Sequence, residues 1–186
     1  RSLPMTRTAL VEENVLPDTQ FSNLPITAEQ LCATALDQAR HKMILPYRAY
    51  DLPLLMARPD FVEYFKFHLA VGLAKAIGGV DEHVQAVHYF DPNLNPDAQT
   101  ETAVPLDPTV NLLVVVASNS AALRSYLTAL DGYLTQAVKE LPSPLFATLY
   151  SLINVMLVTA DDIAQRRGYS LLLDSIYTPT RRLWAR

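Results

Sequence analysis

Three polar residues stand near the beginning of apolar runs, where their side chains could act on one ligand. Thr109 and Asn111 lie two residues apart around the start of the run 110–117, which reads VNLLVVVA. Asn154 lies in a second run, 151–158, which reads SLINVMLV. Residues i and i+2 of a strand point to the same face, so Thr109 and Asn111 have the spacing of paired metal ligands. Their hydroxyl and amide groups are weak substitutes for the anionic oxygen that Mg²⁺ prefers, so the spacing suits a metal site and the side chains do not.

A third run, 84–90 (VQAVHYF), is followed directly by Asp91 and Pro92. Proline has no N–H group to donate to a phosphate, and the aspartate carboxylate repels one. The whole chain holds five glycines, which leaves little material for a loop that cradles phosphates. We therefore do not expect the end of this run to bind a phosphate group.

The loop 91–109 is long and polar and contains four prolines. A loop of this length inside a compact domain is usually functional or disordered. Its carboxylates are Asp91, Asp97, Glu101 and Asp107. They could gather a metal ion, but their spacing matches no known metal-binding loop, so a solvated acidic loop is the preferred interpretation.

The run 110–117 predicts the central strand, because an apolar run without alternation must be covered on both faces. The runs 84–90 and 151–158 predict strands that flank it. The fold class is therefore α+β (α/β-like), with a small mixed sheet whose central strand 110–117 is covered by helices. Capping residues and helical spacing predict helices from Thr27 to before Pro46, from Pro59 to Gly78-Gly79, from Ser118 or Ser120 to Leu141, and from Thr159 to near Gly168. A short edge strand is expected at 181–184.

The order of helix, strand, long polar loop, apolar strand, long helix, apolar strand and short helix resembles the minimal nucleotidyltransferase domain of the polymerase-beta-like superfamily, over about residues 60–186. In that family the first strand ends in Gly-Ser, the second carries Asp-x-Asp, and the third supplies another Asp. Here Asp91-Pro92 stands at the first place, Thr109 and Asn111 at the second, and Asn154 at the third. The family's aspartates hold the divalent ions that bridge the triphosphate.

The resemblance implies a nucleotidyltransferase-like domain without a working metal site, which acts by binding or assembly. We expect no catalytic residues, no metal and no cofactor. Nucleotide binding is not expected either. A nucleotide would occupy the five positions that are equivalent to the family's motif residues, which are Asp91, Pro92, Thr109, Asn111 and Asn154. One alternative is an active nucleotidyltransferase in which Asp91 and Asp107 hold the metal instead. Another is an unrelated α/β interaction domain in which the polar residues are ordinary strand ends.

Composition favours a protein partner. Charged residues make up 18% of the 186 residues, below the usual quarter, and the helix that begins at Pro59 carries aromatic residues on more than one side. A homodimer or a complex with another protein is expected on these grounds. The net charge of −4 speaks against nucleic acid as a partner, and no apolar run approaches the ~20 residues of a membrane span. The single cysteine fits a reducing, cytoplasmic location.

The chain is interpreted as an N-terminal arm and helical lead-in (1–58) followed by the nucleotidyltransferase-like core (59–186), which together form one compact domain. Residues 1–26 have three prolines and no clear period, so an irregular arm is expected there.

Overall fold

The computed structural model describes residues 16–91, 107–175 and 179–186. The helices are α1 (Asp18–Ser22), α2 (Leu24–Lys42), α3 (Leu52–Met56), α4 (Pro59–Val80), α5 (Ala121–Lys139), α6 (Pro144–Ala147) and α7 (Ala160–Ala164). Two 3₁₀ helices are η1 (Tyr47–Ala49) and η2 (Gly168–Asp174), and the strands are β1 (Val84–Phe90), β2 (Val110–Val116), β3 (Ile153–Thr159) and β4 (Arg181–Ala185). The predicted α+β class is confirmed.

The sheet is mixed, with the strand order β3-β2-β1-β4. Strand β1 pairs antiparallel with both β2 and β4, whereas β2 pairs parallel with β3. All seven residues of β2 are buried, which confirms the predicted central strand and its need for cover on both faces. The bounds predicted for β1 are those observed, and β3 lies one to two residues later than predicted.

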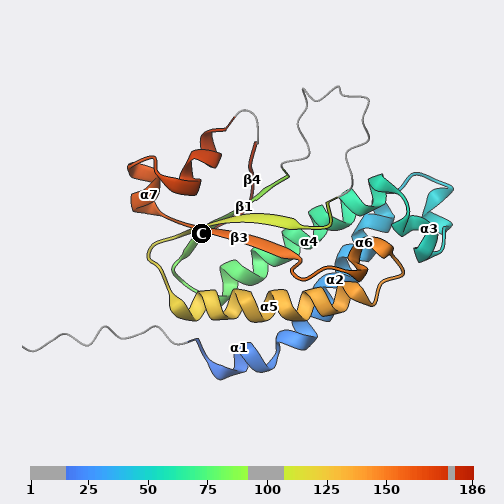
Figure 1. Cartoon of the computed structure of the whole chain (residues 1–186), viewed down its shortest axis with the longest axis horizontal. Helices are drawn as coiled ribbons and strands as arrows, with labels where there is room; N and C mark the ends of the chain where they lie inside the picture. The colour runs from blue at the N-terminus through green and yellow to red at the C-terminus, as the bar shows by residue number, and fades with distance from the viewer. Residues whose placement is uncertain (1–15, 92–106, 176–178) are drawn as a thin grey trace, which may run out of the picture.

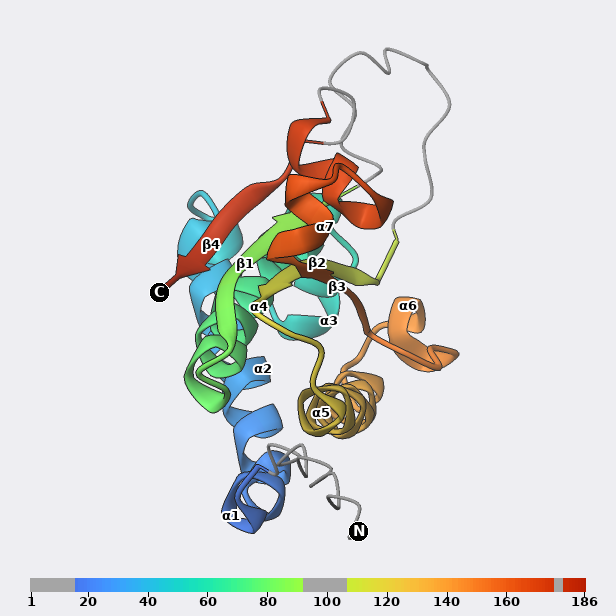
Figure 2. The same cartoon turned by 90° about the vertical axis from the view of Figure 1, so that its left-hand side faces the viewer.

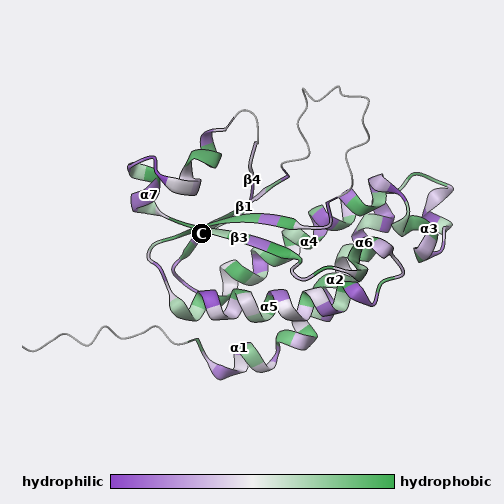
Figure 3. Ribbon diagram, in the orientation of Figure 1, coloured by the Kyte–Doolittle hydropathy of each residue, from purple (hydrophilic) through white to green (hydrophobic). Residues whose placement is uncertain are grey.

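Helices α2, α4 and α5 cover one face of the sheet, and α7 with η2 covers the other (Figures 1 and 2). Helix α4 is the centre of the first layer, because the side chains of Phe61, Phe65, Leu69 and Leu73 are fully buried. Hydrophobic residues run along the strands, whereas hydrophilic residues occupy the outward surface of α5 (Figure 3). A smaller cluster on the other face joins Phe90, Leu113 and Val158 to Leu172 and Leu173 of η2.

Local capping explains where two of the helices begin. The Ser120 hydroxyl accepts a hydrogen bond from the Leu123 N–H (3.2 Å) at the start of α5. At α7, Thr159 and Asp162 exchange two hydrogen bonds between side chain and backbone, which is the capping box that the sequence predicts.

The predicted start of the second helix at Thr27 is wrong. Helix α2 begins three residues earlier at Leu24, and the Thr27 N–H already donates to the Asn23 carbonyl (2.9 Å) inside the helix. Pro25 sits in the first turn, where its missing N–H has no helical partner to lose. The irregular arm predicted for residues 1–26 is also corrected in part, since α1 and the start of α2 lie within it, while residues 1–15 lie outside the described residues.

Helix α2 belongs to the same core as the sheet and packs against α4. The predicted lead-in thus supplies buried residues to the main hydrophobic cluster, among them Leu24, Ala28, Ala35 and Ala39. Between α2 and α4, the chain forms the short helices η1 and α3. No helix in the described ranges has the length and apolar character needed to cross a membrane.

The edge strand β4 is held against α4 by close contact with a glycine. A Cβ atom at Gly78 would meet the indole ring of Trp184, so only glycine leaves room for the ring. The Arg186 guanidinium donates to the Gly78 carbonyl (2.9 Å) and fixes the same region.

We expect Gly78→Ala to lower the free energy of unfolding by about 1–3 kcal/mol, because the new methyl group displaces the indole ring and β4 with it. The matched control is Gly79→Ala, at which no atom lies within 4 Å of the new Cβ. The control should leave stability unchanged or raise it by up to about 1 kcal/mol through helix propensity. Urea unfolding followed by the fluorescence of Trp184, the single tryptophan of the chain, measures both. Equal effects of the two variants would contradict the contact.

Candidate functional site

A lysine lies buried in the middle of the apolar face of α4. The Lys66 Nζ atom lies 3.4 Å from Asp91 Oδ2, and the two side chains are 2% and 3% exposed. The same ammonium group donates to the main-chain oxygen of Asp107 (2.7 Å). Lys66 therefore joins three separate parts of the chain: helix α4, the residue after β1 and the segment that precedes β2.

Helical geometry dictates the burial of this lysine. Position 66 lies one turn after Val62 and one turn before Ala70, both of which are fully buried. Helix positions four residues apart share a face, so the Lys66 side chain must also face the core. An ammonium group removed from water costs several kcal/mol unless an opposite charge and hydrogen-bond acceptors compensate. Asp91 supplies the charge and the Asp107 carbonyl supplies an acceptor.

Asp107 has a second role in the approach to β2. Its carboxylate accepts a hydrogen bond from the Thr109 N–H (2.9 Å), a side-chain turn typical of aspartate. This turn shapes the segment whose carbonyl group reaches Lys66. The Asp107 carboxylate is thus engaged locally, and its carbonyl stabilises the buried ammonium.

The surroundings of the ammonium are acidic. Burial raises the pKa of Glu63, which lies one turn before Lys66, and the nearby charges of Asp91 and Asp107 raise it further, while Lys66 lowers it. Burial also raises the pKa of the Tyr89 hydroxyl, with smaller contributions from the same three carboxylates. One ammonium group therefore lies near three carboxylates, those of Glu63, Asp91 and Asp107.

Two of the positions predicted from the sequence do come together. The Asn154 amide donates to Asn111 Oδ1 (3.1 Å), and the two residues are partners in the parallel register of β2 and β3. They point to the face of the sheet that carries Leu113, because alternate residues of a strand share a face. Asp91 reaches α4 on the opposite face, through Lys66. The carboxylate and the amide pair therefore do not converge on one ligand.

The remaining predicted positions contribute less. Thr109 enters the site through its backbone N–H, as described above. Pro92, Asp97 and Glu101 lie outside the described residues. Within the ranges 16–91, 107–175 and 179–186, no group of three or more His, Cys, Asp or Glu side chains is arranged to hold a metal ion.

Lys66 was not among the residues that the sequence indicated as functional. The available signal was one charged residue in an otherwise apolar row, Val62–Lys66–Ala70, on the helix that begins at Pro59. A charged residue in such a row either extends toward solvent or meets a partner within the core. The partners of Lys66 lie 25 and 41 residues further along the chain, so local sequence could not distinguish the two outcomes.

We expect Lys66→Ala to lower the free energy of unfolding by about 3–5 kcal/mol, because it leaves the Asp91 carboxylate buried beside no ammonium group. Lys75→Ala, at an exposed position of the same helix, is the matched control and should change stability by less than about 0.5 kcal/mol. The double variant Lys66→Met/Asp91→Asn removes both charges and should recover much of the loss. Urea unfolding measures all three, and a loss no larger than that of Lys75→Ala would show that the pair does not stabilise the fold.

The effect of Glu63→Gln on stability at different pH values tests the raised pKa of Glu63. The pKa of Glu63 is raised in the folded chain above its ordinary value of 4.5, so the folded state disfavours the carboxylate form. The contribution of this group to stability is thus full below pH 4.5 and is lost as pH rises through the folded pKa. Glu63→Gln should therefore be more stable than wild type at pH 7, with a smaller difference at pH 4. Glu29→Gln, exposed on α2, is the control, and a difference that shrinks as pH rises would contradict the assignment.

Comparison with known proteins finds no match: no protein-family model, no curated protein and no solved structure is significantly similar to the chain. The candidate site is accordingly defined by its geometry, which comprises the buried Lys66–Asp91 pair on one face of the sheet and the Asn111–Asn154 pair on the other.

Proposed function

We propose that this chain is a nucleotidyltransferase-like domain without a working metal site, and that it acts by binding another protein. The observation that carries the proposal is the hydrogen bond between Asn111 and Asn154. In the resemblance, these two positions belong to carboxylates that hold divalent ions. Two neutral amides, one of which has its oxygen engaged by the other, lack the negative charge that Mg²⁺ prefers in its oxygen ligands.

The engaged state of Asp91 supports the same proposal. Its carboxylate lies beside the Lys66 ammonium and is almost completely buried. A divalent cation at this carboxylate would have to displace the ammonium group or share its space at the cost of like-charge repulsion. The pair therefore gives a structural use to Asp91, the one carboxylate among the five motif-equivalent positions.

The alternative of an active enzyme requires Asp91 and Asp107 to hold the metal. Both carboxylates have other partners, because Asp91 faces Lys66 and Asp107 accepts the Thr109 N–H. The second alternative, an unrelated α/β interaction domain, shares the proposed binding role and differs only in the origin of the fold.

Binding through the aromatic residues of α4 receives little support. Phe61 and Phe65 are fully buried, and the Phe67 ring packs against Tyr89 within the domain, while Tyr64 is 37% exposed. The helix buries most of its aromatic surface in its own core. A binding surface is better sought elsewhere in the fold.

We expect no binding of nucleoside triphosphate in a calorimetric titration with Mg²⁺ or Mn²⁺ and a labelled triphosphate, and no transfer of label. The physical reason is the neutral amide pair at 111 and 154. Clear binding that Asp107→Ala abolishes would overturn the proposal in favour of the active enzyme.

The matched positive control restores the carboxylates. Asn111→Asp/Asn154→Asp places two like charges side by side, so the double variant should be destabilised without metal and should gain stability with Mn²⁺. At a concentration a hundredfold above the dissociation constant, bound Mn²⁺ adds about 2.7 kcal/mol to the free energy of unfolding. A double variant that ignores Mn²⁺ would favour the unrelated interaction domain over the nucleotidyltransferase-like one.

A further inference from the structure

The two edges of the sheet differ in charge. The edge strand β4 presents Arg181 and Arg182, both exposed, and charged side chains of this kind discourage pairing with another chain. The other edge strand, β3, reads INVMLVT and contains neither a charged residue nor a proline. A neutral edge strand of seven residues is a template for an additional strand unless something covers it.

The backbone of β3 leaves hydrogen-bonding groups directed outward. The Val110 N–H donates to the Leu152 carbonyl (2.8 Å), and this bond fixes which backbone groups pair. The N–H and C=O groups of even-numbered residues of β3 point toward β2, and those of odd-numbered residues point away from the sheet. Side chains cap both ends of the outward row. The Ile153 N–H donates to Asp131 (2.8 Å), and the Thr159 N–H donates to Asp162 (3.0 Å).

Between these caps, Val155 and Leu157 each direct one N–H and one C=O group away from the sheet. No described residue forms a hydrogen bond with these outward groups. Four hydrogen-bonding groups in the spacing of a strand ladder match a short extended segment.

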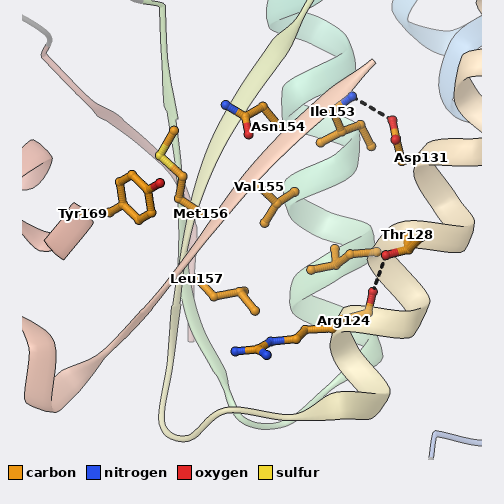
Figure 4. Close-up of a pocket in the computed structure, with 10 residues that line it drawn as sticks. Arg124, Thr128, Asp131, Ile153, Asn154, Val155, Met156, Leu157 and Tyr169 are labelled. Atoms are coloured by element: carbon orange, nitrogen blue, oxygen red, sulfur yellow. Dashed lines mark hydrogen bonds between the residues drawn. The ribbon is translucent and has the colours of Figure 1, made fainter. Parts of the chain in front are cut away.

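A groove of about 530 Å³ follows this edge. Helix α5 forms one wall with Arg124, Thr128 and Asp131, and Tyr169 of η2 stands on the other side beside Met156 (Figure 4). Because α5 and η2 flank the edge on both faces, the groove suits a single extended segment better than the sheet edge of a second copy.

We propose that this groove binds an extended segment of a partner protein, which pairs with β3 as a fifth strand and places an apolar side chain beside Val155 and an acidic side chain beside Arg124. The inference rests on the proposed function and names the surface and partner chemistry through which it acts.

Charge determines where the acidic residue lies. Arg124 is exposed and its guanidinium donates to the neutral Asn119 amide oxygen (3.2 Å), so its positive charge remains available to a carboxylate. Figure 4 places Arg124 near Leu157 and Asp131 near Ile153. The Asp131 carboxylate repels an acidic residue from its own end of the groove. Since alternate residues of a strand share a face, the apolar and acidic residues of the partner are separated by one residue.

The probes are two fluorescein-labelled, capped peptides, Thr-Glu-Thr-Val-Thr and Thr-Val-Thr-Glu-Thr, which fit antiparallel and parallel pairing. Fluorescence anisotropy with the full chain measures binding, and amide hydrogen exchange locates it. We expect one peptide to bind and to slow exchange at Val155 and Leu157. Binding of neither peptide would overturn the proposal.

Two variants test the two halves of the proposal. Leu157→Pro removes one outward N–H at a position where an edge strand tolerates proline, and should weaken binding at least tenfold. Arg124→Glu should weaken the binding of the Glu-containing peptide and strengthen the binding of the same peptide with Lys in place of Glu. This variant keeps the test informative if the proline variant fails to fold. Lys139→Glu, exposed at the end of the same helix, should leave binding unchanged. Binding that survives both Leu157→Pro and Arg124→Glu would overturn the proposal.

Sedimentation and the nucleotide titration on the same samples separate the remaining outcomes. A wild-type dimer that Leu157→Pro converts to a monomer would identify a second copy as the occupant and overturn the proposed partner segment. If neither the peptides nor the nucleotide bind, the proposed binding of a partner segment in the groove is refuted, while the proposed function is not. Binding of metal and triphosphate would refute the proposed function, whatever the peptides do.

Discussion

The burial of β2 on both faces is the constraint on which the rest of the structure depends. A strand of seven buried residues needs one layer of cover above the sheet and another below it. Helices α2, α4 and α5 supply one layer, and the short segments α7 and η2 supply the other. Because β2 also needs a hydrogen-bonded neighbour on each side, it requires β1 and β3. This requirement leaves β3 at one edge and, once β4 has paired with β1, places β4 at the other.

The same dry interior explains the chemistry of the candidate site. Asp91 follows the end of β1 and Asp107 precedes β2, and at both residues a polar group enters a region beside α4 with little water. Lys66 satisfies the Asp107 carbonyl there and balances the charge of Asp91. The lysine thus fastens the two ends of the segment that connects β1 to β2. A buried ion pair that performs this task is a structural element first, and it uses a carboxylate that a metal site would need free.

Much of the sheet could be predicted from sequence, because apolar runs and capping residues act locally. The central strand predicted at 110–117 and the Thr159 cap both follow from neighbouring residues, and the structure confirms both, with the strand one residue shorter than predicted. The start of α2 could not be placed correctly, because Thr27 offers a plausible cap although the helix already begins at Leu24. The role of Lys66 depends on partners that are distant in sequence. Local pattern indicates that a residue is unusual, whereas the fold decides what it meets.

The edge position of β3 shows the same limit most clearly. The strands β2 and β3 have nearly the same composition, VNLLVVV and INVMLVT, and neither contains a charge. In β2 the apolar composition is explained by burial within the sheet. In β3 it is explained only in part, because this strand has a neighbour on one side and residues such as Asn154 are exposed. The arginines of β4 show that the chain does place charge on an exposed edge. An edge that lacks such protection, while carboxylates cap the backbone at both of its ends and leave the middle open, has the features of a surface built to accept a strand.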